Sequence, residues 1–294
     1  MHAKPLQTQA KSSISIRSIN PQFQATKSRY WFDGNPFITH MVHALSFLFP
    51  PGEQMFVNSV NYYKDQIQDP QLKRAVKAFA GQEHLHSASH QQFNDWIASQ
   101  VPAAEQYCAA LTEGINRNYE RLEKKKPIFN LAVTVALEHL TAIMAATFLR
   151  REDILDKVDP QVRSLLIWHA IEEIEHKNVA FDVYLAVGGS YRDRVLALLI
   201  STVVLFFKTF YYQTQLLIQD GQWRNGRAAW SAIKQLFGSQ GFFTEASRSY
   251  LQYFKPSFHP SQHQDQELVE RWQRKLADLT SVRVLGRVEL DAAR

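Results

Sequence analysis

Glutamate and histidine recur at helical intervals in the stretch Trp168-His-Ala-Ile-Glu-Glu-Ile-Glu-His176. At about 100° per residue, His169, Glu173 and His176 fall within roughly 60° of one another on one helix face. Carboxylate and imidazole groups without thiolates are typical ligands of iron and manganese, and they also suit zinc. The stretch therefore predicts a helix that points three metal ligands in one direction.

A second copy of the Glu-x-x-His spacing lies upstream at Glu83 and His86, and His90 follows one turn later. Glu53 and Glu138 lie on two further segments with helical apolar patterns. Two helices with Glu-x-x-His and two that each add one Glu make the inward-facing ligand set of a ferritin-like di-metal bundle. We predict a metal site formed by Glu53, Glu83, His86, His90, Glu138, His169, Glu173 and His176.

Charge balance determines the predicted number of ions. Four ionised carboxylates inside a helical bundle repel one another and lose several kcal/mol each in hydration. Two divalent cations would balance their four charges, so we expect two ions, with iron first and manganese or zinc as alternatives. Glu172 lies beside the ligand face, where it could act as a catalytic base or orient a ligand histidine. Glu175 points away and is expected to form a surface ion pair.

Composition excludes several classes of protein. The chain has 294 residues, 45% of them hydrophobic, which is enough for a sizeable core. Its 33 Lys and Arg against 28 Asp and Glu are scattered along the chain, so no nucleic-acid surface is expected. The single cysteine, Cys108, excludes an intramolecular disulfide and a thiolate metal site. The first residues lack the apolar run of a signal peptide, and we expect a cytoplasmic protein.

Low glycine and proline contents and the scarcity of alternating apolar patterns predict an all-α fold. We expect an extended or disordered arm over residues 1–35 and the ferritin-like di-metal bundle over residues 36–190. The pair Pro50-Pro51 should end one helix and start another, which would place Glu53 near a helix N-terminus. Further helices are expected over 71–99, 103–125, 128–151 and 160–188. Residues 191–294 should add an apolar helix and shorter amphipathic helices packed on the bundle.

Residues 195–218 form an apolar run whose only charge is Lys208. Its length exceeds the roughly 20 residues that span a bilayer. We favour a buried helix or a homodimer interface, because Lys208 lies near the middle. A helix lying in a membrane interface and a true membrane span are the alternatives. A homodimer with possible peripheral membrane contact is therefore expected.

Three longer motifs carry a resemblance to a known family. They are Phe49-Pro-x-Gly-Glu53, Gln82-Glu-x-x-His86-x-x-x-His90 and Trp168-His-x-x-Glu-Glu-x-Glu-His-Lys-x-Val-Ala-Phe-Asp182. Together they resemble the family of predicted metal-dependent hydrolases over roughly residues 35 to 270. The spacing of His169, Glu173 and His176 is also similar to the ligand helix of di-iron arylamine N-oxygenases. This second resemblance implies Glu53, Glu83, His86, Glu138, His169, Glu173 and His176 as ligands.

Two reaction classes are compatible with this ligand set. The first, which the ligand types favour, is O2-dependent oxidation or oxygenation of a small organic substrate by two irons and an electron donor. The alternative is hydrolysis by a metal-activated water, with Glu172 or a histidine as the base. Metal storage without catalysis is the third possibility.

Overall fold

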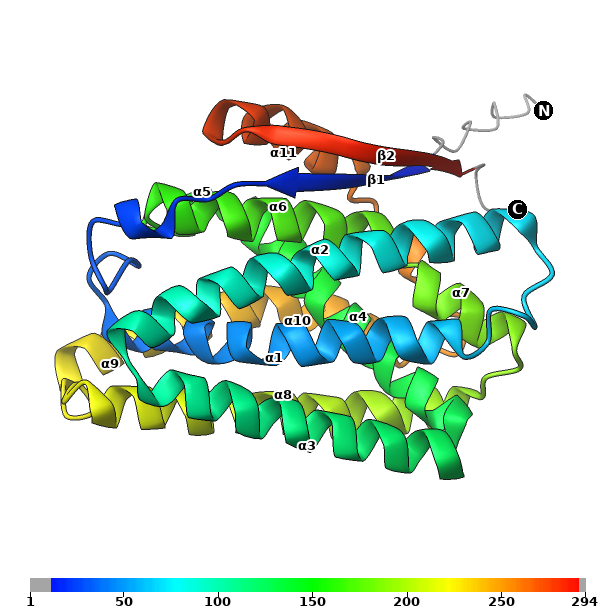
Figure 1. The fold of residues 1–294 in the computed structure, drawn as a ribbon, viewed down its shortest axis with the longest axis horizontal. Helices are drawn as coiled ribbons and strands as arrows, with labels where there is room; N and C mark the ends of the chain where they lie inside the picture. Colours follow the sequence, from blue (N-terminus) through cyan, green and yellow to red (C-terminus); the bar gives the residue numbers. More distant parts are fainter. Residues whose placement is uncertain (1–11, 291–294) are drawn as a thin grey trace.

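The computed structural model describes residues 12–290, and most of them are α-helical (Figure 1). The predicted helical class is therefore confirmed. The long helices are α1 (Pro36–Asn61), α2 (Pro70–Gln100), α3 (Ala103–Lys125), α4 (Pro127–Arg150), α6 (Pro160–His176) and α8 (Tyr191–Gln219). The shorter ones are α5 (Glu152–Leu155), α7 (Val179–Ala186), α9 (Gly226–Phe237), α10 (Phe242–Gln252) and α11 (Gln266–Leu279).

Three of the long helices begin in the same way, with an Asn or Asp directly before a proline. The carboxylates of Asp69 and Asp159 accept from the backbone N–H groups of Gln71 and Gln161, and the amide oxygen of Asn35 caps α1 likewise. Proline suits the first helical turn because its missing N–H would have no partner there. These local signals set the starts of α1, α2 and α6, three of the helices that carry predicted ligands.

The predicted helix break at Pro50-Pro51 is wrong, because α1 continues through both prolines. Pro50 has no N–H to donate to the carbonyl of Ser46 one turn earlier. Asn94 Nδ2 on α2 donates to that carbonyl instead, at 3.1 Å. A neighbouring helix thus supplies the missing donor, and Glu53 lies inside a long helix rather than at an N-terminus.

The helix expected over residues 160–188 is divided into α6 and α7. Lys177, between them, donates its ammonium group to Asp265 Oδ2 and to the carbonyl of His263, both at 2.8 Å. After α7 the chain turns at Gly188, whose φ of +81° is easily reached only without a Cβ.

The all-α expectation missed a two-stranded antiparallel sheet. Strand β1 (Ser12–Ile19) pairs with β2 (Val282–Leu290), with an irregular register between Ile16 and Arg17. Isoleucine and serine alternate in β1, which is a strand pattern that lay inside the supposed arm. The sheet covers α2 and α6 on one side of the bundle (Figure 1).

The apolar core forms two clusters that meet at the predicted ligands. Trp168 of one cluster packs its ring 4.9 Å from that of His86, and Phe79 of the other packs 5.0 Å from that of His176. Both aromatic rings are fully buried. Helices α1, α2, α4 and α6 therefore bring their polar side chains together in a dry interior.

Two helices within residues 12–290 are long and apolar enough to cross a membrane by length and composition. Helix α4 is a core helix, because 72% of its most apolar window is buried. In α8 only 28% of that window is buried. Residues 195–218 are therefore not a buried helix within one copy of the chain, and the homodimer interface that was preferred alongside it stays a prediction.

Candidate metal centre

The predicted ligands come from four helices and converge in the middle of the bundle. Helix α1 contributes Glu53 and α4 contributes Glu138, while α2 and α6 contribute the Glu-x-x-His pairs. Every one of these side chains is buried, and the most exposed residue is His169 at 6%. None of the candidate ion-binding groups found among residues 12–290 includes a residue of α3.

One group of ligands surrounds the imidazole of His176. Its Nε2 atom lies 3.1 Å from Glu83 Oε1, 3.3 Å from Glu138 Oε2 and 3.6 Å from Glu173 Oε2. Glu83, Glu138 and His176 are close enough to share one ion.

A second group lies beside the first. His86 Nδ1 is 3.8 Å from Glu83 Oε1 and 3.8 Å from Glu173 Oε1. His169 Nε2 is 2.7 Å from Glu173 Oε1 and 3.8 Å from Glu53 Oε1. Glu83 and Glu173 thus face both groups, as carboxylates between two adjacent ions would.

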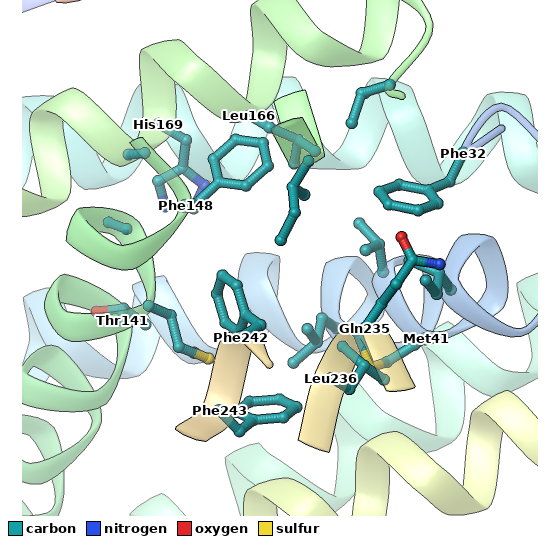
Figure 2. A pocket seen from close by; sticks show the side chains of 18 of the residues that line it. Phe32, Met41, Thr141, Phe148, Leu166, His169, Gln235, Leu236, Phe242 and Phe243 are labelled. Carbon is teal, nitrogen blue, oxygen red and sulfur yellow. The ribbon is translucent and has the colours of Figure 1, made fainter. Parts of the chain in front are cut away.

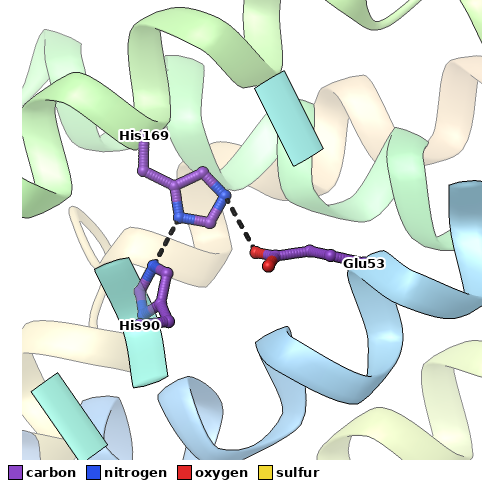
Figure 3. Close-up of side chains that lie close together, drawn as sticks. All are labelled: Glu53, His90 and His169. Atoms are coloured by element: carbon purple, nitrogen blue, oxygen red, sulfur yellow. Dashed lines mark hydrogen bonds and ion pairs between the residues drawn. The ribbon is translucent and has the colours of Figure 1, made fainter. Parts of the chain in front are cut away.

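His90 lies behind His169 rather than at the centre of either group. Figure 3 shows its ring against that of His169, with His90 Nε2 2.7 Å from His169 Nδ1, while Nε2 of His169 faces Glu53. The other nitrogen of His90 is 2.9 Å from Ser46 Oγ. Glu53, His90 and His169 could also hold an ion, so a ligand role for His90 stays a prediction.

Two ligand histidines have their outer nitrogens fixed by buried side chains. Glu172 Oε2 lies 3.1 Å from His86 Nε2, and Gln82 Oε1 lies 3.0 Å from His176 Nδ1. Such partners set the tautomer and ring orientation of a metal-binding histidine. Glu172 is therefore positioned to orient His86, as one of its two predicted roles requires, and its role as catalytic base stays a prediction.

Arg17 of β1 contacts two glutamates of α6 on the outer side of the cluster. Its guanidinium contacts Glu172 Oε1 at 3.3 Å and Glu175 Oε1 at 2.8 Å, and its backbone N–H donates to Glu172 at 3.1 Å. The ion pair predicted for Glu175 is present, but the expectation of a surface pair is wrong because its side chain is only 3% exposed. Sequence reasoning missed Arg17 and Gln82. The alternation of residues in β1 could have indicated a strand that carries Arg17, and the position of Gln82 directly before Glu83 could have indicated a residue beside the cluster.

Three further buried histidines lie outside the cluster. His43 accepts a hydrogen bond from Trp31 Nε1 at 2.8 Å and contacts His40, whose outer nitrogen faces Asp220. His139 is directed away from the ligands and packs 4.6 Å from the ring of Tyr253. None of the three is part of a candidate ion-binding group within residues 12–290.

Several buried oxygen and nitrogen atoms of the cluster have no hydrogen-bond partner that could replace a bound cation. Among the described residues, both carboxylate oxygens of Glu53, Glu83 and Glu138 are buried without a hydrogen-bond partner, as are His86 Nδ1 and His176 Nε2. Buried polar atoms are nearly always paired, and a lone buried carboxylate costs several kcal/mol. The residues therefore fit bound divalent metal ions.

The electrostatics of the cluster agree with this fit. Burial and the neighbouring carboxylates raise the pKa of Glu53 well above its ordinary value, and burial does the same for Glu83 despite His176. Burial also raises the pKa of Glu138 to about 7. Burial acts to raise the pKa of Glu173 too, but His176 and His169 hold it well below the usual range. A cation would relieve the repulsion among the carboxylates.

An apolar cavity of about 160 Å³ borders the second ligand group. Figure 2 shows His169 at one end and Phe148, Leu166 and Phe242 along the walls. Glu173 also lines the cavity, and Thr141 Oγ1 donates to Glu173 Oε2 at 2.5 Å. The cavity could hold an apolar molecule against the ligands.

Comparison with known proteins gives one match. A family model described as predicted metal-dependent hydrolase matches residues 15–264, a range that includes all eight predicted ligands, Arg17 and Gln82. No curated protein and no solved structure matches the chain. Because the model covers most of the chain and all of the Glu/His cluster, the protein belongs to the family of predicted metal-dependent hydrolases.

Proposed function

We propose that the Glu/His cluster binds two divalent metal ions and that the protein uses them to hydrolyse a small apolar substrate held in the adjoining cavity. The observation that carries the proposal is the pair of ligand groups that share Glu83 and Glu173 and border the cavity through His169. The ligand order along α1, α2, α4 and α6 supports a ferritin-like arrangement.

We prefer hydrolysis to oxidation as the reaction because the family description names it, although the ligand types alone favoured oxidation. Metal ions held in such a site supply a coordinated water of lowered pKa and polarise the bond to be cleaved. The apolar walls formed by Phe148, Leu166 and Phe242 would bind the carbon skeleton and exclude other water. Thr141 would keep the carboxylate of Glu173 in its orientation.

The proton acceptor for hydrolysis must lie near the cavity. Glu172 lies behind His86, with its oxygens directed to that ring and to Arg17. His169 lines the cavity, and its Nδ1 is hydrogen-bonded to His90. Because Nε2 of His169 faces Glu173 and the proposed ions while its Nδ1 is bonded to His90, His169 would serve as a ligand rather than as the proton acceptor.

O2-dependent oxidation is the second candidate. It is favoured by a donor set of carboxylates and imidazoles without thiolate, which suits iron, and by a cavity whose walls would shield a reactive species from water.

The test compares protein loaded separately with Zn(II), Mn(II) and Fe(II). Ester, amide and phosphate substrates with apolar tails are offered without O2, and O2 uptake is measured in parallel. The hydrolase proposal expects metal-dependent cleavage without O2 that Glu173→Ala abolishes and the exposed control Glu120→Ala retains. Oxygen consumption by the iron form alone, with no cleavage, would establish the second candidate instead.

A further inference from the structure

Helix α8 presents an apolar stripe to solvent along its length. Leu196, Ile200, Val203, Phe207 and Tyr211 recur every three or four residues and are between 44% and 69% exposed. The opposite face of α8 packs against α1 and α4. The helix is therefore half embedded in the bundle and half without a partner in one copy of the chain.

The short helix α9 extends this apolar surface. Trp230, Ile233 and Phe237 are each about half exposed and lie on one face of α9. Aromatic contacts join the two helices, because the ring of Phe206 on α8 lies 5.1 Å from that of Phe243, and Phe243 lies 5.2 Å from Phe237. We call the exposed apolar residues of the two helices the α8–α9 face.

Basic residues accompany this face. Residues 191–252 contain seven Lys and Arg, of which only Arg194 is buried, but three Asp and Glu. The guanidinium of Arg224 lies 4.4 Å above the ring of the exposed Trp223, and the ammonium of Lys234 lies 5.3 Å from the centre of the Trp230 ring. Exposed tryptophan beside Lys and Arg is the combination that binds the interface of an anionic bilayer.

A second copy of the chain is a poorer occupant for the face than a bilayer. A two-fold interface brings identical patches together, so the cations of one copy would approach those of the other. One of the three acidic residues, Asp220, is already paired with Arg29 and His40. Anionic lipid headgroups would neutralise the excess positive charge. A full span of α8 is inconsistent with its packing, because Leu198 and Leu216 are completely buried in the bundle.

The face also adjoins the cavity beside the metal centre. Phe243, whose ring joins α8 to α9, lines the cavity together with Leu236 and Phe242 (Figure 2). We propose that the α8–α9 face docks the protein peripherally on an anionic lipid bilayer, from which the cavity takes a lipid-soluble substrate. The statement about the substrate rests on the proposed function, whereas the docking does not.

Co-sedimentation with vesicles tests the docking on the full, metal-loaded chain. Binding is expected to vesicles of phosphatidylcholine with phosphatidylglycerol, and it should weaken with salt and on phosphatidylcholine alone. The double variant Val203→Glu and Phe207→Glu should lose at least about tenfold in binding. The control double variant Val284→Glu and Leu285→Glu places the same two charges at exposed positions of β2 and should bind normally. Replacing Arg224 by Ala should cost about fivefold.

Size-exclusion chromatography and metal analysis of the same samples separate the outcomes. The proposal is overturned if the unmodified protein is a dimer that does not bind vesicles and the double variant is a monomer, because the face is then a dimer interface. It is also overturned if the unmodified protein is a monomer that does not bind vesicles. If either of these samples holds two ions per chain, the proposed function is unaffected. If the protein binds vesicles but takes up no metal, the docking is supported and the metal site is refuted.

Discussion

The imidazole of His86 lies between Glu172, 3.1 Å from its Nε2 atom, and the two carboxylates of Glu83 and Glu173 that face its Nδ1 atom. A buried carboxylate in this position makes the inner nitrogen a better electron-pair donor and fixes the ring. The proposed metal centre would therefore depend on a group that does not itself face the ions.

We expect Glu172→Gln to keep the fold and to lower metal affinity by roughly 10- to 100-fold. The amide cannot match the carboxylate as an acceptor from His86, although it retains the size of the side chain. Competition with a metal chelator measures the affinity, and Glu120→Gln on the surface of α3 is the matched control. Equal affinities in the two variants would show that the contact with His86 has no role in metal binding.

Glu83 and Glu173, which face both ligand groups, should contribute more to metal binding than the carboxylates that face only one group. Glu138 contacts only the His176 group, whereas Glu173 contacts His176, His86 and His169. Glu138→Ala should therefore retain about one ion per chain, and Glu173→Ala should retain essentially none. Metal analysis after gel filtration gives the stoichiometry, and circular dichroism checks the helix content. Two ions in both variants would contradict the ligand assignment.

Metal binding should release protons and weaken as the pH falls. Burial raises the pKa of Glu138 to about 7 and those of Glu53 and Glu83 well above their ordinary value, so these groups keep their protons to higher pH in the metal-free protein than free carboxyl groups do. An incoming ion must displace them. Titrating metal into weakly buffered protein with an indicator dye should reveal more than one proton per chain. Absence of release would mean that the metal-free carboxylates are already ionised.

His139 should make the protein less stable in mild acid. Burial, with His263 and Arg194, lowers its pKa to about 3 in the folded state, against 6.5 when unfolded. As the pH falls below 6.5, only the unfolded chain takes up this proton, so stability is lost. His139→Phe should remove a destabilisation of about 2 kcal/mol at pH 5 while changing little at pH 8. Urea unfolding at both values measures the difference, and a variant whose effect is independent of pH would refute it.

The long helices could be predicted because their signals are local. Asp69-Pro70 and Asp159-Pro160 start helices by their own geometry, and the Glu-x-x-His spacings place ligands on one face whatever surrounds them. The grouping of Glu53 and Glu138 with these pairs followed from the ligand set of ferritin-like bundles, in which two further helices each add one Glu. The sequence could also suggest the orienting role of Glu172, because it lies beside the ligand face.

Other features depend on contacts that no local pattern encodes. The continuity of α1 through Pro50 requires Asn94 on another helix, and the burial of Glu175 requires Arg17 on a distant strand. Strand β1 was missed because its alternation is short and its partners, β2 and helices α2 and α6, are distant from it along the chain. The exposure of α8 likewise depends on which helices cover it.

The pairing of β1 with β2 joins the two ends of the described chain beside the acidic interior. Residues 20–281 separate the two strands, so β1 is synthesised long before its partner leaves the ribosome. Until then the partners of β1 are α2 and α6, where the backbone N–H of Arg17 donates to Glu172 and that of Ser15 donates to Glu175. The complete sheet over the cluster can therefore form only after the helices between its two strands have been made.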